Sequence, residues 1–311
     1  MKEKSRGDKD MECKRVFRQD ACEEQMVLRG DKQYPSSLED LPRPPKQLYF
    51  QVKASLLKSR CVGIVGSRKT TEYGRWAAGR IAAKLAGNGI TIISGLAVGI
   101  DAAAHRGALE AEGATIAVLG CGLGHEYPQK NRMLRQEIAG RGLVITEYDR
   151  EMAPTKYTFP YRNRIIAAMA ECIILVEAGL HSGALQTADA ALSMNKPVYV
   201  VPGNINSACS FGSNLLIREG AQPLMTVDDI LDYLNLPRRL SRQSVKLLGE
   251  EERKVFNHLQ NGQEKSVDEL VRELSMGAGR INGIITVLEM KGLVYTAMGK
   301  VFITEQQEMP R

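Results

Sequence analysis

The sequence predicts an α/β protein with an extended Rossmann-like, doubly wound and mostly parallel sheet, followed by a small C-terminal winged-helix domain. Six short apolar runs recur through the middle of the chain, and none of them alternates apolar with polar residues. Continuous apolar runs are typical of parallel strands that helices cover on both faces. Glycine or another turn-former stands at each junction between a run and the next helical stretch, as in a doubly wound fold. The runs span residues 61–65, 91–94, 115–119, 143–146, 172–176 and 197–201.

Length and composition are those of a globular protein with one large domain and one smaller module. The chain has 311 residues, is 43% hydrophobic and 25% charged, and carries a formal net charge of +6. Part of this excess is local, because residues 130–164 hold eight Lys/Arg and four Asp/Glu. This positive charge is compatible with an anionic partner. No signal peptide, membrane-length apolar run or CxxC pair is found, so we expect a cytoplasmic protein with reduced cysteines and no membrane contact.

The first 60 residues precede the predicted sheet domain, which spans residues 61–236. Residues 1–25 are polar with mixed charge, and we expect them to be a disordered stub. Residues 26–60 include a proline-punctuated stretch, 34–50, which disfavours helix. We interpret 26–60 as an arm that packs on the sheet domain.

The first candidate site follows the first strand, in the stretch VGIVGSRKTTEYG at residues 62–74. Backbone N–H groups of a turn at Gly66, Ser67 and Arg68 could bind a phosphate at the carboxyl end of the sheet, together with the Ser67 hydroxyl and the Arg68 guanidinium. Thr71 can cap the next helix. The spacing matches neither the dinucleotide-binding nor the Walker motif, so no nucleotide cofactor is predicted. The alternative is a tight strand–helix turn with a solvated arginine.

A second candidate is the pair Asp101 and His105, which are four residues apart in a predicted helix. A carboxylate oriented toward an imidazole could serve acid–base chemistry. A structural role is the alternative that we favour, because no nucleophile stands at a recognisable spacing. The other histidines are isolated, so no metal site and no catalytic residue are predicted.

The third candidate is the stretch APTKYTFPYRNR, residues 153–164, which precedes a predicted short helix at 165–171. Cations at a helix N-terminus oppose the helix dipole and indicate a missing anion. Three cations, one amide and one aromatic ring could hold the backbone and a base of a single strand; they are Lys156, Arg162, Arg164, Asn163 and Phe159 (or Tyr157). In the alternative interpretation Phe159 belongs to the core and one arginine pairs with Glu147 or Glu177.

A further strand–helix junction, at residues 177–192, places Ser182, Gly183 and Thr187 at a helix entrance. They could form a second anion contact, and simple helix capping is the alternative.

Residues 237–245 are predicted to be a linker and residues 246–306 a winged helix. Ser266 and Glu269 form a capping box, and apolar residues at 281, 284, 285 and 288 mark a third helix, ended by Gly292. Two strands flank a turn at Gly299. From residue 238 onward twelve Lys/Arg face ten Asp/Glu, a small surplus for a duplex reader. Contact of the winged helix with another protein is therefore at least as well supported as binding to duplex DNA.

These motifs, in this order, resemble the DNA processing protein A (DprA/Smf) family. The resemblance rests on IVGSRKTTEYG, SGLAVGIDAAAH, TIAVLGCGLGHEYPQKN, FPYRNRIIA, VEAGLHSGALQTA and VPGNINSACSFGSNLLI. Three features depart from the family pattern: the loop at 146–154, which carries Asp149 and Glu151-Met152, the polar stub, where members often carry a helical domain, and Gly124, which replaces a frequent acid.

The resemblance implies a non-enzymatic protein that binds single-stranded DNA, forms a homodimer through its sheet domain and helps to load the RecA recombinase during DNA processing and natural transformation. Carried over by position, Gly66, Ser67 and Arg68 hold a phosphate, Lys156 contacts the backbone and Phe159 a base. Arg162, Asn163 and Arg164 complete the basic pocket.

Two other functions remain as alternatives. One is a nucleotide-hydrolysing enzyme similar to the LOG phosphoribohydrolases, although the turn at Glu177-Ala178-Gly179 lacks that family's PGGxGTxxE stretch. The other is a duplex-binding regulator that acts through the winged helix.

Overall fold

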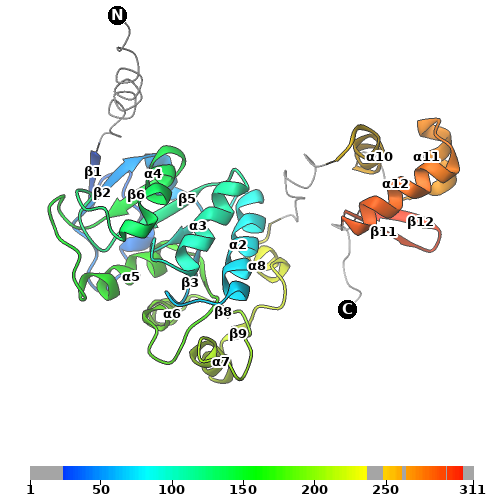
Figure 1. The fold of residues 1–311 in the computed structure, drawn as a ribbon. Helices are drawn as coiled ribbons and strands as arrows, with labels where there is room; N and C mark the ends of the chain where they lie inside the picture. Colours follow the sequence, from blue (N-terminus) through cyan, green and yellow to red (C-terminus); the bar gives the residue numbers. More distant parts are fainter. Residues whose placement is uncertain (1–23, 237–247, 261–263, 292, 304–311) are drawn as a thin grey trace, which may run out of the picture.

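A computed structural model describes residues 24–236, 248–260, 264–291 and 293–303 of the protein (Figure 1). The predicted stub lies outside these residues except for its last two, and the predicted linker at 237–245 lies outside them entirely. No helix within the described residues is both long enough and apolar enough to cross a membrane.

The sheet domain is built on nine strands in the order β1-β2-β6-β5-β4-β3-β7-β8-β9. The six predicted strands are all present, fully buried and parallel: β3 (Cys61–Val65), β4 (Thr91–Ser94), β5 (Thr115–Val118), β6 (Leu143–Thr146), β7 (Cys172–Leu175) and β8 (Val198–Val200). Strand order reverses at β3, which pairs with β4 on one side and β7 on the other. Ligands of open α/β sheets bind at such a switch point, beyond the carboxyl ends of the strands.

Three further strands extend the sheet at its edges. β1 (Glu24–Leu28) and β2 (Gln47–Val52) join β6 as antiparallel strands, and β9 (Gln222–Pro223) joins β8 in parallel. The segment interpreted as an arm thus forms one edge of the sheet. Two short 3-10 helices, η1 (Ser36–Leu38) and η2 (Ala54–Lys58), flank β2.

Helices cover both faces of this sheet (Figure 1). One face packs against α2 (Glu72–Gly87), α3 (Ile100–Glu110), α4 (Arg132–Arg141, preceded by η3, Gln129–Asn131) and α8 (Asp228–Tyr233). The other packs against α5 (Thr158–Met169), α6 (Gly183–Ser193) and α7 (Phe211–Arg218). Side chains of successive strand residues point to opposite faces, so each strand supplies two hydrophobic cores.

The start of α5 differs from the prediction. The helix begins at Thr158 instead of residue 165, so Arg162 and Arg164 lie in its second turn. Pro160 is compatible with this start because the first turn of a helix needs no backbone N–H donor. Thr155 and Thr158 also exchange side-chain hydrogen bonds with each other's backbone N–H groups, at 3.1 and 3.3 Å. The argument that these arginines oppose the helix dipole is therefore wrong, because the dipole effect falls off within the first turn.

The C-terminal domain contains α10 (Glu250–Gln260), α11 (Val267–Leu274), α12 (Ala278–Met290) and a sheet in the order β10-β12-β11. The strands are β10 (Lys265–Ser266), β11 (Val294–Ala297) and β12 (Lys300–Ile303). The capping box at Ser266 and Glu269 is confirmed. Gly292, the predicted helix stop, lies outside the described residues.

Candidate nucleic-acid interface

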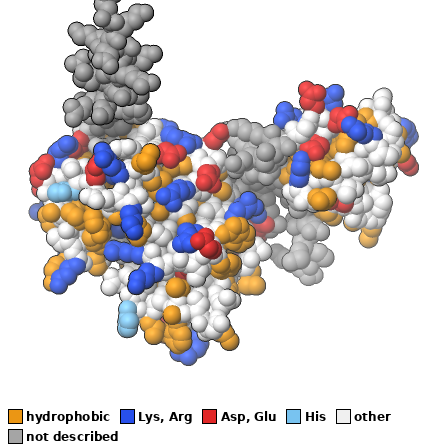
Figure 2. All heavy atoms as spheres, in the orientation of Figure 1, with side chains coloured by type: hydrophobic (Ala, Val, Ile, Leu, Met, Phe, Trp, Pro, Cys, Tyr) orange, Lys and Arg blue, Asp and Glu red, His pale blue; other side chains and the backbone are white. Residues whose placement is uncertain are grey.

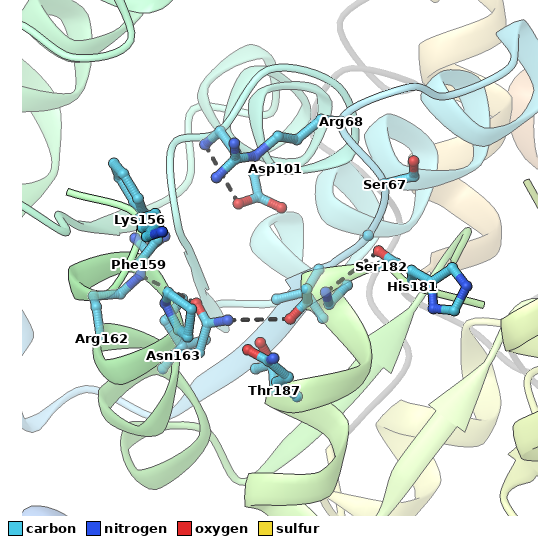
Figure 3. A pocket seen from close by; sticks show the side chains of 18 of the residues that line it. Ser67, Arg68, Asp101, Lys156, Phe159, Arg162, Asn163, His181, Ser182 and Thr187 are labelled. Atoms are coloured by element: carbon cyan, nitrogen blue, oxygen red, sulfur yellow. Dashed lines mark hydrogen bonds between the residues drawn. The ribbon is translucent and has the colours of Figure 1, made fainter. Parts of the chain in front are cut away.

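A cavity of about 920 Å³ opens at the carboxyl ends of the strands around the switch point (Figure 3). Its walls come from the turn after β3, the start of α3, the approach to α5 and the start of α6. Ten of the eleven predicted site residues line it: Gly66, Ser67, Arg68, Lys156, Phe159, Arg162, Asn163, Ser182, Gly183 and Thr187. Lys69, Tyr127 and His181 line it as well. Figure 2 shows Lys and Arg side chains interspersed with hydrophobic ones on the visible face of the sheet domain.

The turn after β3 is held by its own hydrogen bonds. The Ser67 hydroxyl donates to the Lys69 carbonyl at 2.6 Å and accepts from the Lys69 backbone N–H at 3.1 Å. A Cβ at Gly66 would lie 2.6 Å from the Ile100 side chain. Glycine at this position thus allows α3 to pack closely against the turn, a requirement separate from phosphate binding.

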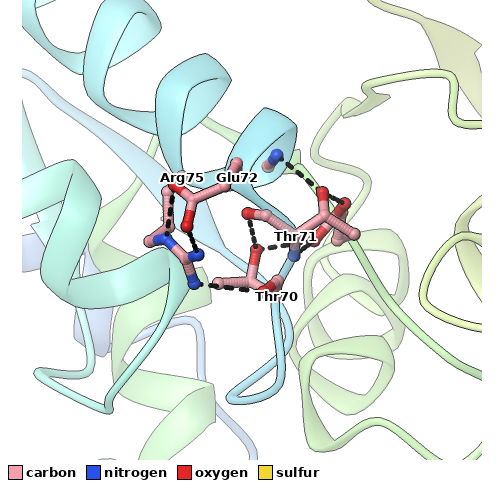
Figure 4. A network of polar contacts seen from close by, with 6 residues as sticks. Thr70, Thr71, Glu72 and Arg75 are labelled. Atoms are coloured by element: carbon pink, nitrogen blue, oxygen red, sulfur yellow. Dashed lines mark hydrogen bonds and ion pairs between the residues drawn. The ribbon is translucent and has the colours of Figure 1, made fainter.

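A buried carboxylate, Glu177, follows β7 and fixes the same turn. Figure 4 shows the polar network around Thr70 and Thr71. Glu177 accepts hydrogen bonds from the Thr70 hydroxyl at 2.5 Å, the Thr71 hydroxyl at 2.5 Å and the Thr71 backbone N–H at 2.9 Å. The Thr71 hydroxyl in turn accepts from the Gly74 N–H at 3.0 Å, which confirms it as the cap of α2. All three donors to Glu177 are neutral groups, so neither Arg68 nor Lys156 is taken up by this carboxylate.

Three cations, Arg68, Lys69 and Lys156, line the cavity, and none of their side chains has a hydrogen-bond or ion-pair partner among the described residues. All three are exposed. The Arg68 guanidinium lies 5.4 Å from the centre of the Phe159 ring, and the Lys156 ammonium lies 5.1 Å from that of Tyr157. An unpaired cation in a concave site is available to bind an anion.

Two aromatic rings form one wall of the cavity. The centres of the Phe159 and Tyr127 rings lie 5.2 Å apart with a tilt of 36°. A Cβ at Gly120 would lie 2.6 Å from the Phe159 ring, so glycine lets the ring rest on the loop after β5. A small recess of about 40 Å³ lies beside the two rings. Tyr127 was missed in the sequence because it precedes α4, 32 positions before Phe159.

Arg162 lines the cavity from a buried position and also makes structural contacts. It is 4% exposed, and its guanidinium donates to the carbonyls of Gly95, at 2.9 Å, and Val118. Burial lowers the pKa of Arg162 to about 10, and the nearby Asp101 carboxylate opposes this shift. The side chain thus joins α5 to the ends of β4 and β5. Its positive charge lies at the floor of the cavity and contributes to the electrostatic potential there.

Arg164 lies outside the cavity lining, contrary to the prediction. It forms an ion pair with Glu147, and the two side chains are only 14% and 12% exposed. Burial raises the pKa of Glu147, while the Arg164 guanidinium opposes that rise. The alternative in which one arginine pairs with Glu147 therefore describes this residue.

The pair Asp101 and His105 is structural in its contacts. Asp101 accepts from the backbone N–H groups of Gly95, at 3.2 Å, and Ala97, at 3.4 Å. His105 Nδ1 lies 2.7 Å from the Thr115 hydroxyl, and burial lowers the pKa of His105 to about 3. Burial also raises the pKa of Asp101. Each side chain thus has its own partners, and the helical spacing does not bring the two together.

The start of α6 shows helix capping. The Ser182 hydroxyl accepts from the Ala184 N–H at 3.3 Å, and Asn163 donates to the Gly183 carbonyl at 3.2 Å. Asn163 thereby links α5 to α6. Among the described residues no group of three or more His, Cys, Asp or Glu side chains could hold a metal ion.

Comparison with known proteins matches nearly all of the chain to one family. Residues 25–235 match DNA recombination-mediator protein A, and residues 241–300 match the DprA winged helix domain. The putative DNA processing protein DprA of Mycobacterium tuberculosis is 36% identical over 247 residues, which cover 78% of this chain and 64% of that protein. The match thus spans less than two thirds of the mycobacterial protein.

Two solved structures are similar to the greater part of this chain. DNA processing protein A from Streptococcus pneumoniae has a TM-score of 0.65 and 36% identity, covering 72% of this chain and 77% of that one. DNA processing protein A from Helicobacter pylori, described for its single-stranded DNA binding mode, has a TM-score of 0.63 and 32% identity, covering 70% and 97%. The strand order, the winged helix and these matches agree, and this chain therefore belongs to the DNA recombination-mediator protein A family, also called DprA or Smf.

Proposed function

We propose that the protein binds single-stranded DNA in the cavity at the switch point. The observation that carries this proposal is that two of the unpartnered cations, Arg68 and Lys156, share one cavity with the Phe159 and Tyr127 rings. The description of the H. pylori relative as a single-stranded DNA binder supports it.

Each residue of the cavity has a proposed role that follows from the chemistry of its side chain or backbone. Arg68 and the backbone of the turn at Gly66 and Ser67 hold one phosphate, and Lys156 holds a second. An unpaired base stacks on the aromatic wall, which discriminates against duplex DNA because paired bases keep their faces in the helical stack. Arg162 adds its positive field from below, and Ser182, Gly183 and Thr187 form the opposite rim. Arg164, which is paired with Glu147 outside the cavity lining, is left out of this proposed contact set.

We propose a non-enzymatic role over the alternative of a nucleotide-hydrolysing enzyme. Glu177, the acidic residue that follows β7, already accepts three hydrogen bonds from the turn after β3, so it is engaged in holding structure. Release of a free base from a nucleoside monophosphate, measured by chromatography, would instead support the enzyme.

The partners follow from the family resemblance and are part of the proposal. The protein acts in the cytoplasm as a homodimer, protects incoming single-stranded DNA and helps to load RecA on it. Faster RecA filament assembly on protein-coated DNA, and a dimer mass by light scattering, are the results expected.

The decisive experiment measures binding of oligo-dT by fluorescence anisotropy across a salt series. Arg68→Ala and Lys156→Ala should each weaken binding about 10- to 100-fold, because each removes a charge-assisted phosphate contact of roughly 1.5–3 kcal/mol. Each should also reduce the salt slope by about 0.7. Arg29→Ala is the matched control, since Arg29 is an exposed, ion-paired arginine outside the cavity. Wild-type affinity in both cavity variants would contradict the proposal.

A further inference from the structure

An exposed aromatic pair, Tyr73 and Trp76, lies on the first two turns of α2, directly after the turn that enters the cavity. The two side chains are 50% and 62% exposed. Their ring centres lie 6.1 Å apart, and the ring planes are inclined by 30°, so they form a stacked pair on the outside of the sheet domain. Large aromatic surface left open to water in a stacked arrangement indicates a binding role.

The polar network around Thr70 and Thr71 ties the start of α2, which carries the pair, to the turn after β3 (Figure 4). Arg75, between the two aromatic residues, donates to the Thr70 carbonyl at 3.1 Å, and Thr71 is fixed by Glu177. Lys69 lines the cavity, and chain geometry keeps its Cα within roughly 16 Å of that of Trp76. A bound strand can therefore reach the pair after leaving the cavity.

The surrounding charge favours a polyanion. Lys69, before the pair, and Arg80, one helical turn after Trp76, are exposed, and their side chains have no ion pair or hydrogen bond among the described residues. Glu72 is the one acidic residue between Lys69 and Arg80, and it is paired with Arg75. Cations that alternate with stacked rings are the arrangement that binds single strands without regard to sequence.

From this geometry we infer that Tyr73 and Trp76 form a second stacking platform for the same single strand, outside the cavity. The inference rests on the proposed function and extends it: the cavity holds one part of the strand, and the platform stacks unpaired bases further along. The consequence is a dependence on strand length. A short oligonucleotide occupies the cavity alone, whereas a longer one reaches both places.

The test uses the full chain and oligo-dT of about 4 to about 16 nucleotides. Trp76 is the only tryptophan of the chain, so its fluorescence reports directly on the platform. Long oligonucleotides should quench this fluorescence and short ones should not. Trp76→Ala should weaken binding of the long oligonucleotide about 5-fold or more and that of the short one less than 2-fold. Trp76→Phe should restore most of the affinity, and Met133→Ala, which removes another exposed apolar side chain, should have no effect.

The outcomes separate this inference from the function on which it rests. Unchanged fluorescence and unchanged affinity in Trp76→Ala, with binding still lost in Arg68→Ala, would overturn the platform and leave the cavity proposal standing. Absence of any oligonucleotide binding by the wild type would overturn both. A change of oligomeric mass in Trp76→Ala, without a change in DNA affinity, would assign the pair to a contact between copies of the chain and overturn the platform.

Discussion

Replacement of Arg162 by methionine tests whether this arginine supports the cavity or binds the DNA itself. In the structure the guanidinium donates to two backbone carbonyls, those of Gly95 and Val118, and lies close enough to the Asp101 carboxylate to affect its pKa. Methionine keeps much of the side-chain length and removes the charge and all donors. The substitution leaves Asp101 as a buried carboxylate without its nearby cation.

Loss of one partner from a buried pair of charges destabilises a protein by about 3–5 kcal/mol. For a domain of this size each kcal/mol shifts the melting temperature by about 2–4 °C. We therefore expect Arg162→Met to lower the melting temperature by roughly 6–20 °C. The double variant Asp101→Asn/Arg162→Met should recover part of this loss, because the uncharged amide needs no counter-charge.

The dependence on pH has a definite sign. Burial raises the pKa of Asp101 in the folded state, and the Arg162 cation opposes that rise. Without Arg162 the folded protein holds the Asp101 proton more tightly than the unfolded chain does. The stability deficit of Arg162→Met should therefore be full at neutral pH and shrink as the pH falls through the raised pKa of Asp101.

The assay is thermal and urea unfolding at several pH values, together with oligo-dT binding of the folded variant. Wild-type stability combined with a large loss of DNA affinity would refute the structural role and restore Arg162 as a direct phosphate ligand. A deficit that grows on acidification would refute the assignment to Asp101.

Three further predictions concern other parts of the chain. Gly66→Ala should lower the free energy of unfolding, measured by urea denaturation, by about 1–3 kcal/mol, because the new Cβ would lie 2.6 Å from the Ile100 side chain. Gly140→Ala is the control: this position on α4 faces open space, so the substitution should be neutral or stabilising. Burial lowers the pKa of folded His105 to about 3, whereas its unfolded pKa is about 6.5, so the stability that the neutral imidazole contributes is present above pH 6.5 and is lost as the pH falls toward 3. The melting temperature of His105→Gln should therefore decline less over that pH range than that of the wild type. An equal decline would argue against this role of His105. Arg280 of α12 is already paired with Glu251, so Arg280→Ala should change duplex affinity of the full chain less than 2-fold in a gel-shift assay; a large loss would support duplex reading by the winged helix.

Local patterns in the sequence determined much of the fold. The six parallel strands followed from continuous apolar runs, since a strand covered on both faces has no position for a charged side chain and few for a polar one. The caps at Thr71 and Ser266 followed from residues within three positions of their partners. The positions of Arg68 and Lys156 at the carboxyl edge of the sheet also followed, because both lie in segments between a strand and the next helix.

Tertiary structure decided what each charged side chain contacts. Arg162 and Arg164 are two positions apart in one helix. Arg162 reaches carbonyls at the ends of β4 and β5, whereas Arg164 reaches a partly buried glutamate after β6. The edge strands β1, β2 and β9 likewise depend on partners far away in the chain. Tyr127 joins Phe159 only because the fold brings the loop after β5 against the first turn of α5. The sequence by itself determined which segments are buried and where cations gather, because these depend on neighbours along the chain. Which cations stay free for DNA was decided by long-range packing, because a guanidinium is neutralised by whatever group the fold places beside it.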